Sequence, residues 1–218
     1  MLKNRLISFI FSFILFLMVA CTAKTPGKTE NVQARKLNDS ATVIWFRVKG
    51  LIYPKDSLKR SISLFKEAIH QDSSYRLAYH NLWNCLNDVG DYAQSEAVCT
   101  EWIDKHPDDT DFIIKRGILM EVLGREQQAE IDYNKVMHAV RKDPLPEIDQ
   151  RLSPEDIQKA IARAYNLIIL TKDKDEALKI MAELKKSFPG NSQVEAMNEK
   201  IRHLDRKEYL NGLVGYNN

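Results

Sequence analysis

Residues 76–109 read RLAYHNLWNCLNDVGDYAQSEAVCTEWIDKHPDD, and residues 110–143 read TDFIIKRGILMEVLGREQQAEIDYNKVMHAVRKD. Both segments have the same length, and Gly90 and Gly124 hold the same place in each. A fixed period of roughly 34 residues is typical of chains built from stacked pairs of helices. Such pairs bury their apolar faces only by stacking on one another, which leaves an extended surface for partners. The repeat therefore predicts a binding scaffold, but it does not identify the partner.

Side chains of similar size recur at the same interval. Ser61, Ser95 and Ala129 share a position that carries only small residues. Two antiparallel helices can approach closely at such a position, so we expect the helices of each pair to meet there. Other positions in register are mainly large and apolar: Phe65, Cys99 and Tyr133, then Ala68, Trp102 and Val136, then Trp45, Tyr79 and Ile113.

The pattern resembles the tetratricopeptide repeat, in which two helices with large and small apolar positions occupy about 34 residues. In residues 76–109, Tyr79 fills a large position, Gly90 begins the turn and Pro107 closes the second helix. Trp83 departs from the pattern, because the family usually has a small residue there. The resemblance implies an all-α fold, arranged as a right-handed superhelical stack of helix-turn-helix units.

We expect the repeat domain to span residues 41–210, with a capping helix at 192–210 that covers its last apolar face. A proline-rich insertion at 144–157 separates the third unit from the fourth, and its Ser153-Pro154 is typical of a helix start. Residues 211–218 are expected to be frayed. The four repeat units are expected at residues 42–75, 76–109, 110–143 and 158–191.

Residues 1–20 have the layout of an export signal. Lys3 and Arg5 precede an uncharged, mainly apolar run from Leu6 to Ala20. As a helix this run would span about 22 Å, which is short of the ~30 Å hydrocarbon core of a membrane. A cleaved signal therefore fits better than the alternative, a permanent membrane-spanning helix.

Residues 17–21, LMVAC, resemble a bacterial lipobox, at which a peptidase cuts before a cysteine that already carries diacylglycerol. Met18 stands where leucine is commoner. The resemblance implies lipid attachment at Cys21; a secreted protein cut at the same bond is the alternative. In enteric bacteria an aspartate after the cysteine tends to hold such proteins at the inner membrane. Thr22 therefore favours the outer membrane, facing the periplasm. Residues 21–40 are polar and are expected to form a flexible tether.

Composition argues against one class of partner. The chain has 32 Lys and Arg residues against 30 Asp and Glu residues. Removal of the signal takes away Lys3 and Arg5 and no acidic residue, which leaves 30 of each. A neutral domain has little electrostatic attraction for nucleic acid, so we expect no nucleic-acid partner.

Cys85 and Cys99 remain as thiols if Cys21 is acylated. Across a turn at Gly90, their positions are about 9 Å out of step along the helix axes. The Cα atoms of a disulfide are seldom more than ~7 Å apart. Two buried free thiols are therefore expected in preference to a disulfide.

The sequence carries no catalytic signature. It lacks an HExxH pair, a Gly-rich phosphate loop and a Gly-x-Ser-x-Gly elbow, and its five histidines show no i, i+4 pairing with one another. The acidic run Asp108, Asp109 and Asp111 lacks the glycine bend and the downstream glutamate of a calcium loop, so we interpret it as helix capping. We expect no enzymatic activity, no metal and no cofactor.

In the repeat family, partners commonly lie in a concave groove lined by the first helix of each unit. Asparagine side chains in such a groove can pair with a peptide backbone, since each offers donors and an acceptor. A solvated polar face is the alternative. The carboxylate clamp of chaperone-binding members is not expected, because His80 stands where a lysine is needed. The resemblance places these residues in the groove: His80, Asn84, Asn87, Asp88, Ile114, Ile118, Glu121 and Asn166.

Together these features predict a membrane-anchored tetratricopeptide-repeat lipoprotein that acts as a protein-interaction scaffold in the bacterial cell envelope. Outer-membrane protein assembly is a candidate role, because lipoproteins of that machinery share the plan of a lipid anchor followed by repeats. The alternative is a small-molecule-binding or enzymatic lipoprotein with a site near the 144–157 insertion, since long insertions often carry function.

Overall fold

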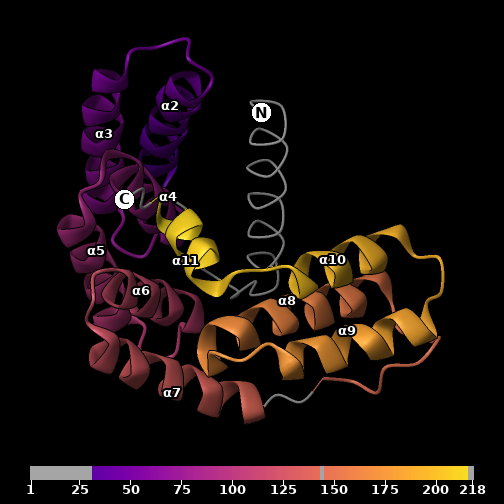
Figure 1. Ribbon diagram of the computed structural model, residues 1–218. Coiled ribbons are helices and arrows are strands. Elements are labelled where there is room, and N and C mark those ends of the chain that lie inside the picture. Colours follow the sequence, from indigo (N-terminus) through magenta and orange to yellow (C-terminus); the bar gives the residue numbers. More distant parts are fainter. Residues whose placement is uncertain (1–30, 143–144, 216–218) are drawn as a thin grey trace. The chain divides into compact units, whose positions relative to one another are not determined.

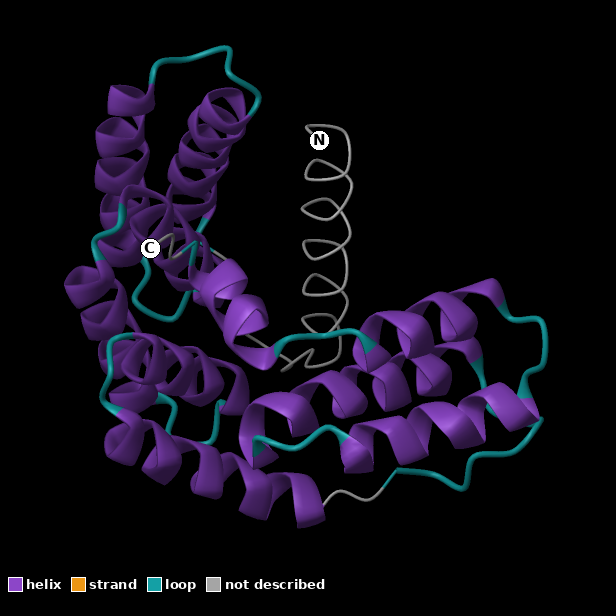
Figure 2. Cartoon of the chain, in the orientation of Figure 1, coloured by secondary structure: helices purple, strands orange, loops and turns teal. Residues whose placement is uncertain are grey.

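The computed structural model describes residues 31–142 and 145–215. Ten α-helices, α2 to α11, and one 3₁₀-helix, η2, lie within these residues, and none of them forms a strand (Figure 1 and Figure 2). The chain divides into two compact units. Residues 31–142 and 205–215 make up the larger unit, and residues 145–204 make up the smaller unit. The prediction of an all-α fold is confirmed.

Helices of the larger unit pack in chain order. Each helix from α2 to α6 contacts the next one along the chain, up to α7 (Figure 1). This order of contacts is that of helical hairpins stacked one after another, as the sequence repeat predicts. The elements of this unit are α2 (Val32–Lys49), η2 (Lys55–Ser57), α3 (Leu58–Gln71), α4 (Arg76–Val89), α5 (Tyr92–Lys105), α6 (Thr110–Val122), α7 (Glu126–Lys142) and α11 (Arg206–Val214).

The two turn glycines end equivalent helices with the same geometry. Gly90 follows α4 with φ 77°, and Gly124 follows α6 with φ 78°, in the left-handed region that glycine tolerates best. The amide of Asp91 donates to the carbonyl of Leu86 over 3.0 Å, and the amide of Arg125 donates to that of Met120 over 2.7 Å. Each bond satisfies a carbonyl that the end of the helix would otherwise leave unpaired.

The positions with small residues lie where the helices of a pair approach each other. Ser61 and Ser95 are fully buried, and Ala129 is almost so. The Ser61 hydroxyl donates to the Ala41 carbonyl on the opposite helix over 2.8 Å. The equivalent bond from Ser95 reaches the Trp83 carbonyl over 3.4 Å. The close contact predicted from residue size is therefore confirmed.

The first helical pair begins earlier than the sequence indicates. The sequence predicts a flexible tether at residues 21–40 and a first unit that starts at residue 42. Both predictions are wrong at this boundary, because α2 already begins at Val32. The side chain of Asn31 caps the helix by accepting bonds from the amides of Gln33 and Ala34. Small and polar residues form much of the buried face of α2, so its apolar signal is weak: Ala34, Asn38, Ala41 and Trp45.

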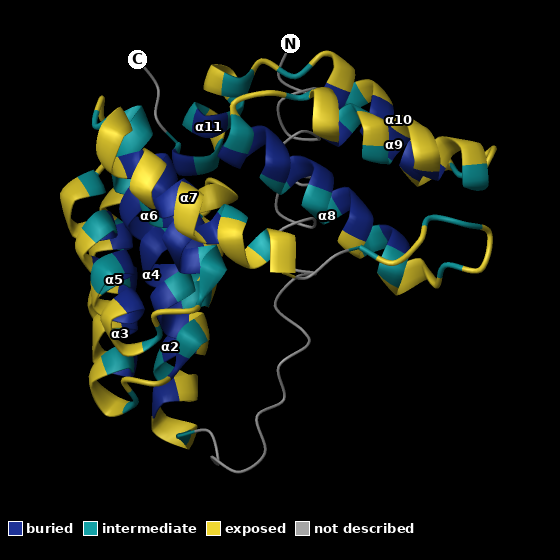
Figure 3. Ribbon diagram, turned by 90° about the horizontal axis from the view of Figure 1, so that it is seen from below, coloured by how far each residue is buried: buried dark blue, intermediate teal, exposed yellow. Residues whose placement is uncertain are grey.

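The smaller unit consists of α8 (Pro154–Thr171), α9 (Asp175–Ser187) and α10 (Ser192–Arg202), which contact one another. Buried residues run along α8, whereas α9 and α10 carry wide exposed faces (Figure 3). Ser153 caps α8 by accepting a bond from the Asp156 amide over 3.1 Å, so the helix starts within the predicted insertion. The loop before it is held by a bond from the Ser187 hydroxyl to the Ile148 carbonyl over 3.1 Å.

The predicted capping helix at 192–210 is two helices. α10 ends at Arg202, and Asp205 begins α11 by accepting a bond from the Glu208 amide over 2.8 Å. α11 belongs to the larger unit. It continues to Val214, so the prediction of a frayed tail is wrong for residues 211–214.

The export signal, Cys21 and the start of the tether lie outside the described residues. Within the residues that the structure describes, no helix combines the length and the apolar character needed to cross a membrane.

Candidate functional site

α11 packs on α4 and α6, the first helices of two successive repeats (Figure 1). We call the residues that it meets there the α11-binding surface: Asn87 of α4, Tyr92 of α5 and Glu121 of α6. Asn87 and Glu121 are among the predicted groove residues. The covering helix is distant in sequence, because its first residue, Arg206, follows Glu121 by 85 residues. Two of the predicted groove residues therefore lie against a helix of the same protein.

One end of α11 is fixed by an ion pair. Both terminal nitrogens of the Arg206 guanidinium donate to the Glu121 carboxylate, one of them over 2.8 Å. Both side chains are mostly buried. Burial would lower the pKa of Arg206, but the hydrogen bond and the charge of Glu121, together with Tyr133, outweigh burial and raise the pKa. Two parallel bonds fix the orientation of the pair as well as its distance.

Tyr133 of α7 is a further hydrogen-bond partner of the Glu121 carboxylate. Its hydroxyl donates to Glu121 over 2.9 Å. Burial and the neighbouring Glu121 carboxylate both raise the pKa of Tyr133, so the phenol stays protonated as a donor. The ring reaches this place because Gly117 of α6 has no side chain: a Cβ at Gly117 would lie 2.6 Å from Cε1 of Tyr133.

The other end of α11 lies against α4 and α5. The Tyr92 hydroxyl donates to the Gly215 carbonyl over 3.3 Å. Asn87 is 4% exposed, and neither atom of its side-chain amide has a hydrogen-bond partner in the described structure. A buried polar group left unpaired costs about 1–3 kcal/mol. The backbone of the same residue lies beside Gly215, at the end of α11.

α11 also buries two aliphatic side chains. Leu210 is 2% exposed and Val214 is fully buried. Together with Arg206 they stand four residues apart, which places all three on one face of the helix. Sequence reasoning missed these residues because it treated 192–210 as one helix. The signal that could have found them is Asp205 followed by Glu208, a typical helix start.

The remaining predicted groove residues lie in different surroundings. Asp88 accepts bonds from the indole of Trp45 and the ammonium of Lys49, each over 2.6 Å, and so joins α2 to α4. The Asn84 amide donates to the His80 carbonyl over 3.0 Å, one turn earlier on α4. Ile118 is 1% exposed and belongs to the core, as does Ile114. Asn166 is half-buried on α8 of the smaller unit.

A cluster of charges joins the start of α4 to the start of α6. Arg76 donates to Asp109 and to Asp111, each over 2.7 Å, and the fully buried Lys115 ammonium lies 2.5 Å from Asp111. Burial alone would raise the pKa of Asp111, but the Lys115 and Arg76 cations hold it at about 2. Burial lowers the pKa of Lys115. Capping explains Asp109, which accepts a bond from the Phe112 amide.

His80 lies beside this charge cluster and gives a pH-dependent prediction. Burial and the nearby Lys115 cation lower the pKa of His80 to about 3, against the opposing effect of Asp111. The unfolded chain therefore binds more protons than the folded chain between about pH 6.5 and pH 3. The contribution of His80 to the free energy of unfolding is complete above this window. As the pH falls through the window, this contribution should decrease by about 1 kcal/mol per pH unit.

Urea unfolding between about pH 7 and pH 4 measures this slope. The three tryptophans, Trp45, Trp83 and Trp102, all lie in the larger unit, so their fluorescence reports its unfolding. His80→Gln should flatten the pH dependence, whereas His138→Gln, at an exposed position of α7, should leave it unchanged. An identical slope in wild type and His80→Gln would contradict the prediction.

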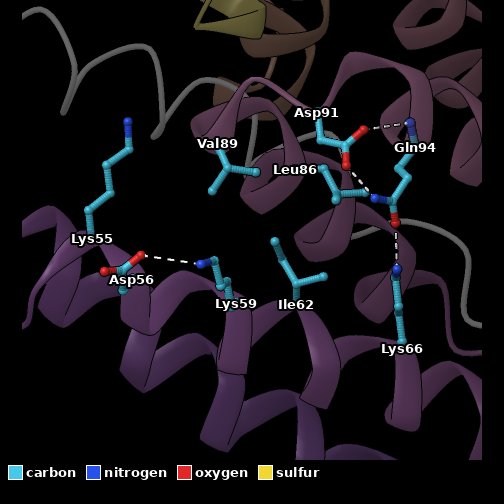
Figure 4. Close-up of a pocket in the computed structure, with 9 residues that line it drawn as sticks. All are labelled: Lys55, Asp56, Lys59, Ile62, Lys66, Leu86, Val89, Asp91 and Gln94. Carbon is cyan, nitrogen blue, oxygen red and sulfur yellow. Dashed lines mark hydrogen bonds and ion pairs between the residues drawn. The ribbon is translucent and has the colours of Figure 1, made fainter.

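A pocket lies between α3 and the α4–α5 turn. It is an open pocket of about 550 Å³. Figure 4 shows Gln94 between Asp91 and Lys66, bonded to both, and Lys59 paired with Asp56. Five of the polar side chains around its apolar floor thus satisfy one another. Its lining consists of Lys55, Asp56, Lys59, Ile62, Lys66, Leu86, Val89, Asp91 and Gln94.

Neither thiol of the repeats is placed for chemistry. Cys85 and Cys99 are both buried and free. Burial raises the pKa of Cys85 to about 12 and that of Cys99 further, so both stay protonated and unreactive. Across the described residues, no group of three or more His, Cys, Asp or Glu side chains is arranged to hold a metal ion.

Comparison with solved structures shows a likeness in fold. No family model and no curated protein matches the chain. The chain is similar to the crystal structure of a tetratricopeptide repeat protein from Parabacteroides merdae ATCC 43184, with 14% sequence identity and a TM-score of 0.48. The alignment covers 97% of this chain and 74% of that chain. The helical-repeat assignment rests on the stacked helices and equivalent turns described above.

Proposed function

We propose that the protein is a membrane-anchored scaffold of the cell envelope that binds a protein segment through the α4–α6 side of its repeats. The observation that carries this proposal is the packing of α11 on the α11-binding surface. An amphipathic helix already lies on that side, held by an ion pair at one end and by two buried aliphatic side chains. Helix-in-groove binding uses the same elements: apolar anchors four residues apart and a charge that fixes direction.

Location is the second part of the proposal and rests on residues 1–22. The lipobox-like LMVAC supports acylation of Cys21, and Thr22 supports the outer membrane. Two or three acyl chains would hold the protein on a membrane, because each buried methylene contributes about 0.8 kcal/mol. Outer-membrane protein assembly is one pathway that a scaffold in this place can serve.

Cys21→Ala is expected to abolish the anchor. Cells grown with a palmitate analogue should label the wild-type protein and not the variant, and the variant should move from the membrane fraction to the soluble fraction. Thr22→Ala, next to the acylated residue, serves as the control and should keep the label. A wild-type protein that takes up no label and is found in the soluble fraction would contradict the anchor.

Partner binding is tested by a photo-crosslinking amino acid in intact cells. Asn84 lies one turn before Asn87 on the same face of α4, so a crosslinker there should form adducts with partner proteins. Ile131 on α7 is 70% exposed and gives the matched control position. Adducts that form equally from both positions, or from Ile131 alone, would place the partner elsewhere.

A further inference from the structure

We propose that α11 is an internal, displaceable ligand of the α11-binding surface. The partner that replaces it is an amphipathic helix with an arginine followed by two aliphatic residues at intervals of four. This inference rests on the proposed function, because it names the partner and the regulation of the same surface. The protein thus has a closed form, with α11 in place, and an open form that accepts the partner helix.

Charge decides which helix fits and in which direction. Glu121 is 15% exposed at its side chain and receives two bonds from Arg206 and one from Tyr133. A carboxylate already held by a buried phenol is fixed before any ligand arrives. A ligand without a cation at this point would leave that carboxylate buried and uncompensated, which is strongly unfavourable. Arginine suits the place because its planar guanidinium makes two parallel bonds.

Apolar contact supplies the remaining recognition. Leu210 and Val214 follow Arg206 at intervals of four, and both are almost completely removed from water. Tyr92 then bonds the backbone of Gly215, where the helix ends with φ 65°. The surface therefore recognises a short helix by one charge, two aliphatic side chains and a free carbonyl at the end.

Two features make α11 an incomplete occupant. The backbone carbonyl of Asn87 lies beside Gly215 at the end of α11, and the side-chain amide of Asn87 is buried without a hydrogen-bond partner in the described structure, so a ligand with a polar side chain within its reach would satisfy it. α11 has only nine residues, and Gly212 lies in its interior. A helix this short is unstable alone in water, and glycine weakens it further. Its binding therefore depends wholly on the surface and is readily reversed.

The full-length purified protein tests the proposal with a fluorescent peptide of residues 205–218, DRKEYLNGLVGYNN. Fluorescence anisotropy measures its affinity. The wild-type protein should bind this peptide weakly, because α11 competes from within. Arg206→Glu in the protein should open the surface and tighten binding at least tenfold, since the apparent dissociation constant falls as the open fraction rises.

Further variants separate opening from damage. Gly212→Pro breaks α11 without touching the surface and should give the same gain in affinity. Glu121→Arg should abolish binding of the peptide, and a peptide carrying Arg206→Glu should bind this variant again. Equal affinity of wild type, Arg206→Glu and Gly212→Pro would overturn the proposal, and so would binding that survives Glu121→Arg.

The peptide assay and the cellular crosslinks fail independently. A surface that binds the peptide as expected but yields no adduct at Asn84 in cells would leave the internal ligand intact and contradict the scaffold function. Adducts at Asn84 together with no binding of the peptide to any variant would retain the scaffold and exclude α11 as its internal ligand.

Discussion

Asp132→Ala is expected to lower the free energy of unfolding of the larger unit by about 3 kcal/mol. Asp132 of α7 is 4% exposed and binds Arg116 of α6 through two bonds, of 2.8 and 2.7 Å. The alanine variant would leave the guanidinium partly buried without its counter-ion. The loss is at the lower end for buried pairs because Arg116 keeps some contact with water.

Urea unfolding followed by tryptophan fluorescence measures this loss. Arg151→Ala is the control, because Arg151 forms a similar pair with Asp149 on the exposed surface of the smaller unit. It should leave both the fluorescence transition and the helix content unchanged. Asp132→Asn keeps the shape of the side chain and should fall between wild type and Asp132→Ala. Equal stability of Asp132→Ala and wild type would show that the Asp132–Arg116 pair contributes nothing.

Gly117→Ala is expected to destabilise the larger unit by up to about 2 kcal/mol, through overpacking against Tyr133. A methyl group at this position would lie 2.6 Å from Cε1 of Tyr133, far inside van der Waals contact. Overpacking of this kind costs about 1–3 kcal/mol, from which the better helix propensity of alanine takes back about 1 kcal/mol. Tyr133 cannot move away freely, because its ring is buried and its hydroxyl is bonded to Glu121.

Gly212→Ala supplies a control with the opposite sign. Gly212 also lies inside a helix, but a Cβ there meets no atom within 4 Å. Helix propensity then acts alone and should stabilise α11 by about 0.5–1 kcal/mol. Gly117→Ala should also weaken binding of the α11 peptide, since it disturbs the tyrosine that holds Glu121. Destabilisation by both alanines to the same extent would contradict packing as the cause.

The repeat was predictable because its evidence is local. Gly90 and Gly124 mark the turns, and Ser61, Ser95 and Ala129 mark the close contacts, all at fixed spacing. The start of α2 was missed because part of its buried face is polar. Asn38 can be buried there because its side chain accepts a bond from Asn81 over 2.9 Å. Such a position looks exposed in the sequence, since its partner lies 43 residues away.

The site was predicted only in part, for a related reason. The repeat pattern predicts which helix comes first in each unit, and Asn87 and Glu121 were predicted from their positions on these helices. The position of α11 depends instead on which surface its apolar side chains meet, and periodicity within residues 206–214 contains no such information. Lys115 is similar: its spacing on α6 gave no hint of full burial, which depends on Asp111 and on the rings of Trp83 and Phe112.

Because the chain is synthesised from its N-terminus, the α11-binding surface is made before the helix that covers it. Glu121 and Asn87 leave the ribosome long before Arg206, because the whole of α8, α9 and α10 lies between α7 and α11. At about 5–20 residues per second, the roughly 70 residues from the end of α7 to the end of α11 take about 4–14 s to make. In the proposed envelope scaffold export also runs from the N-terminus, so a partner helix that meets the chain before α11 emerges competes with no internal ligand. Newly made chains should therefore capture partners faster than mature ones.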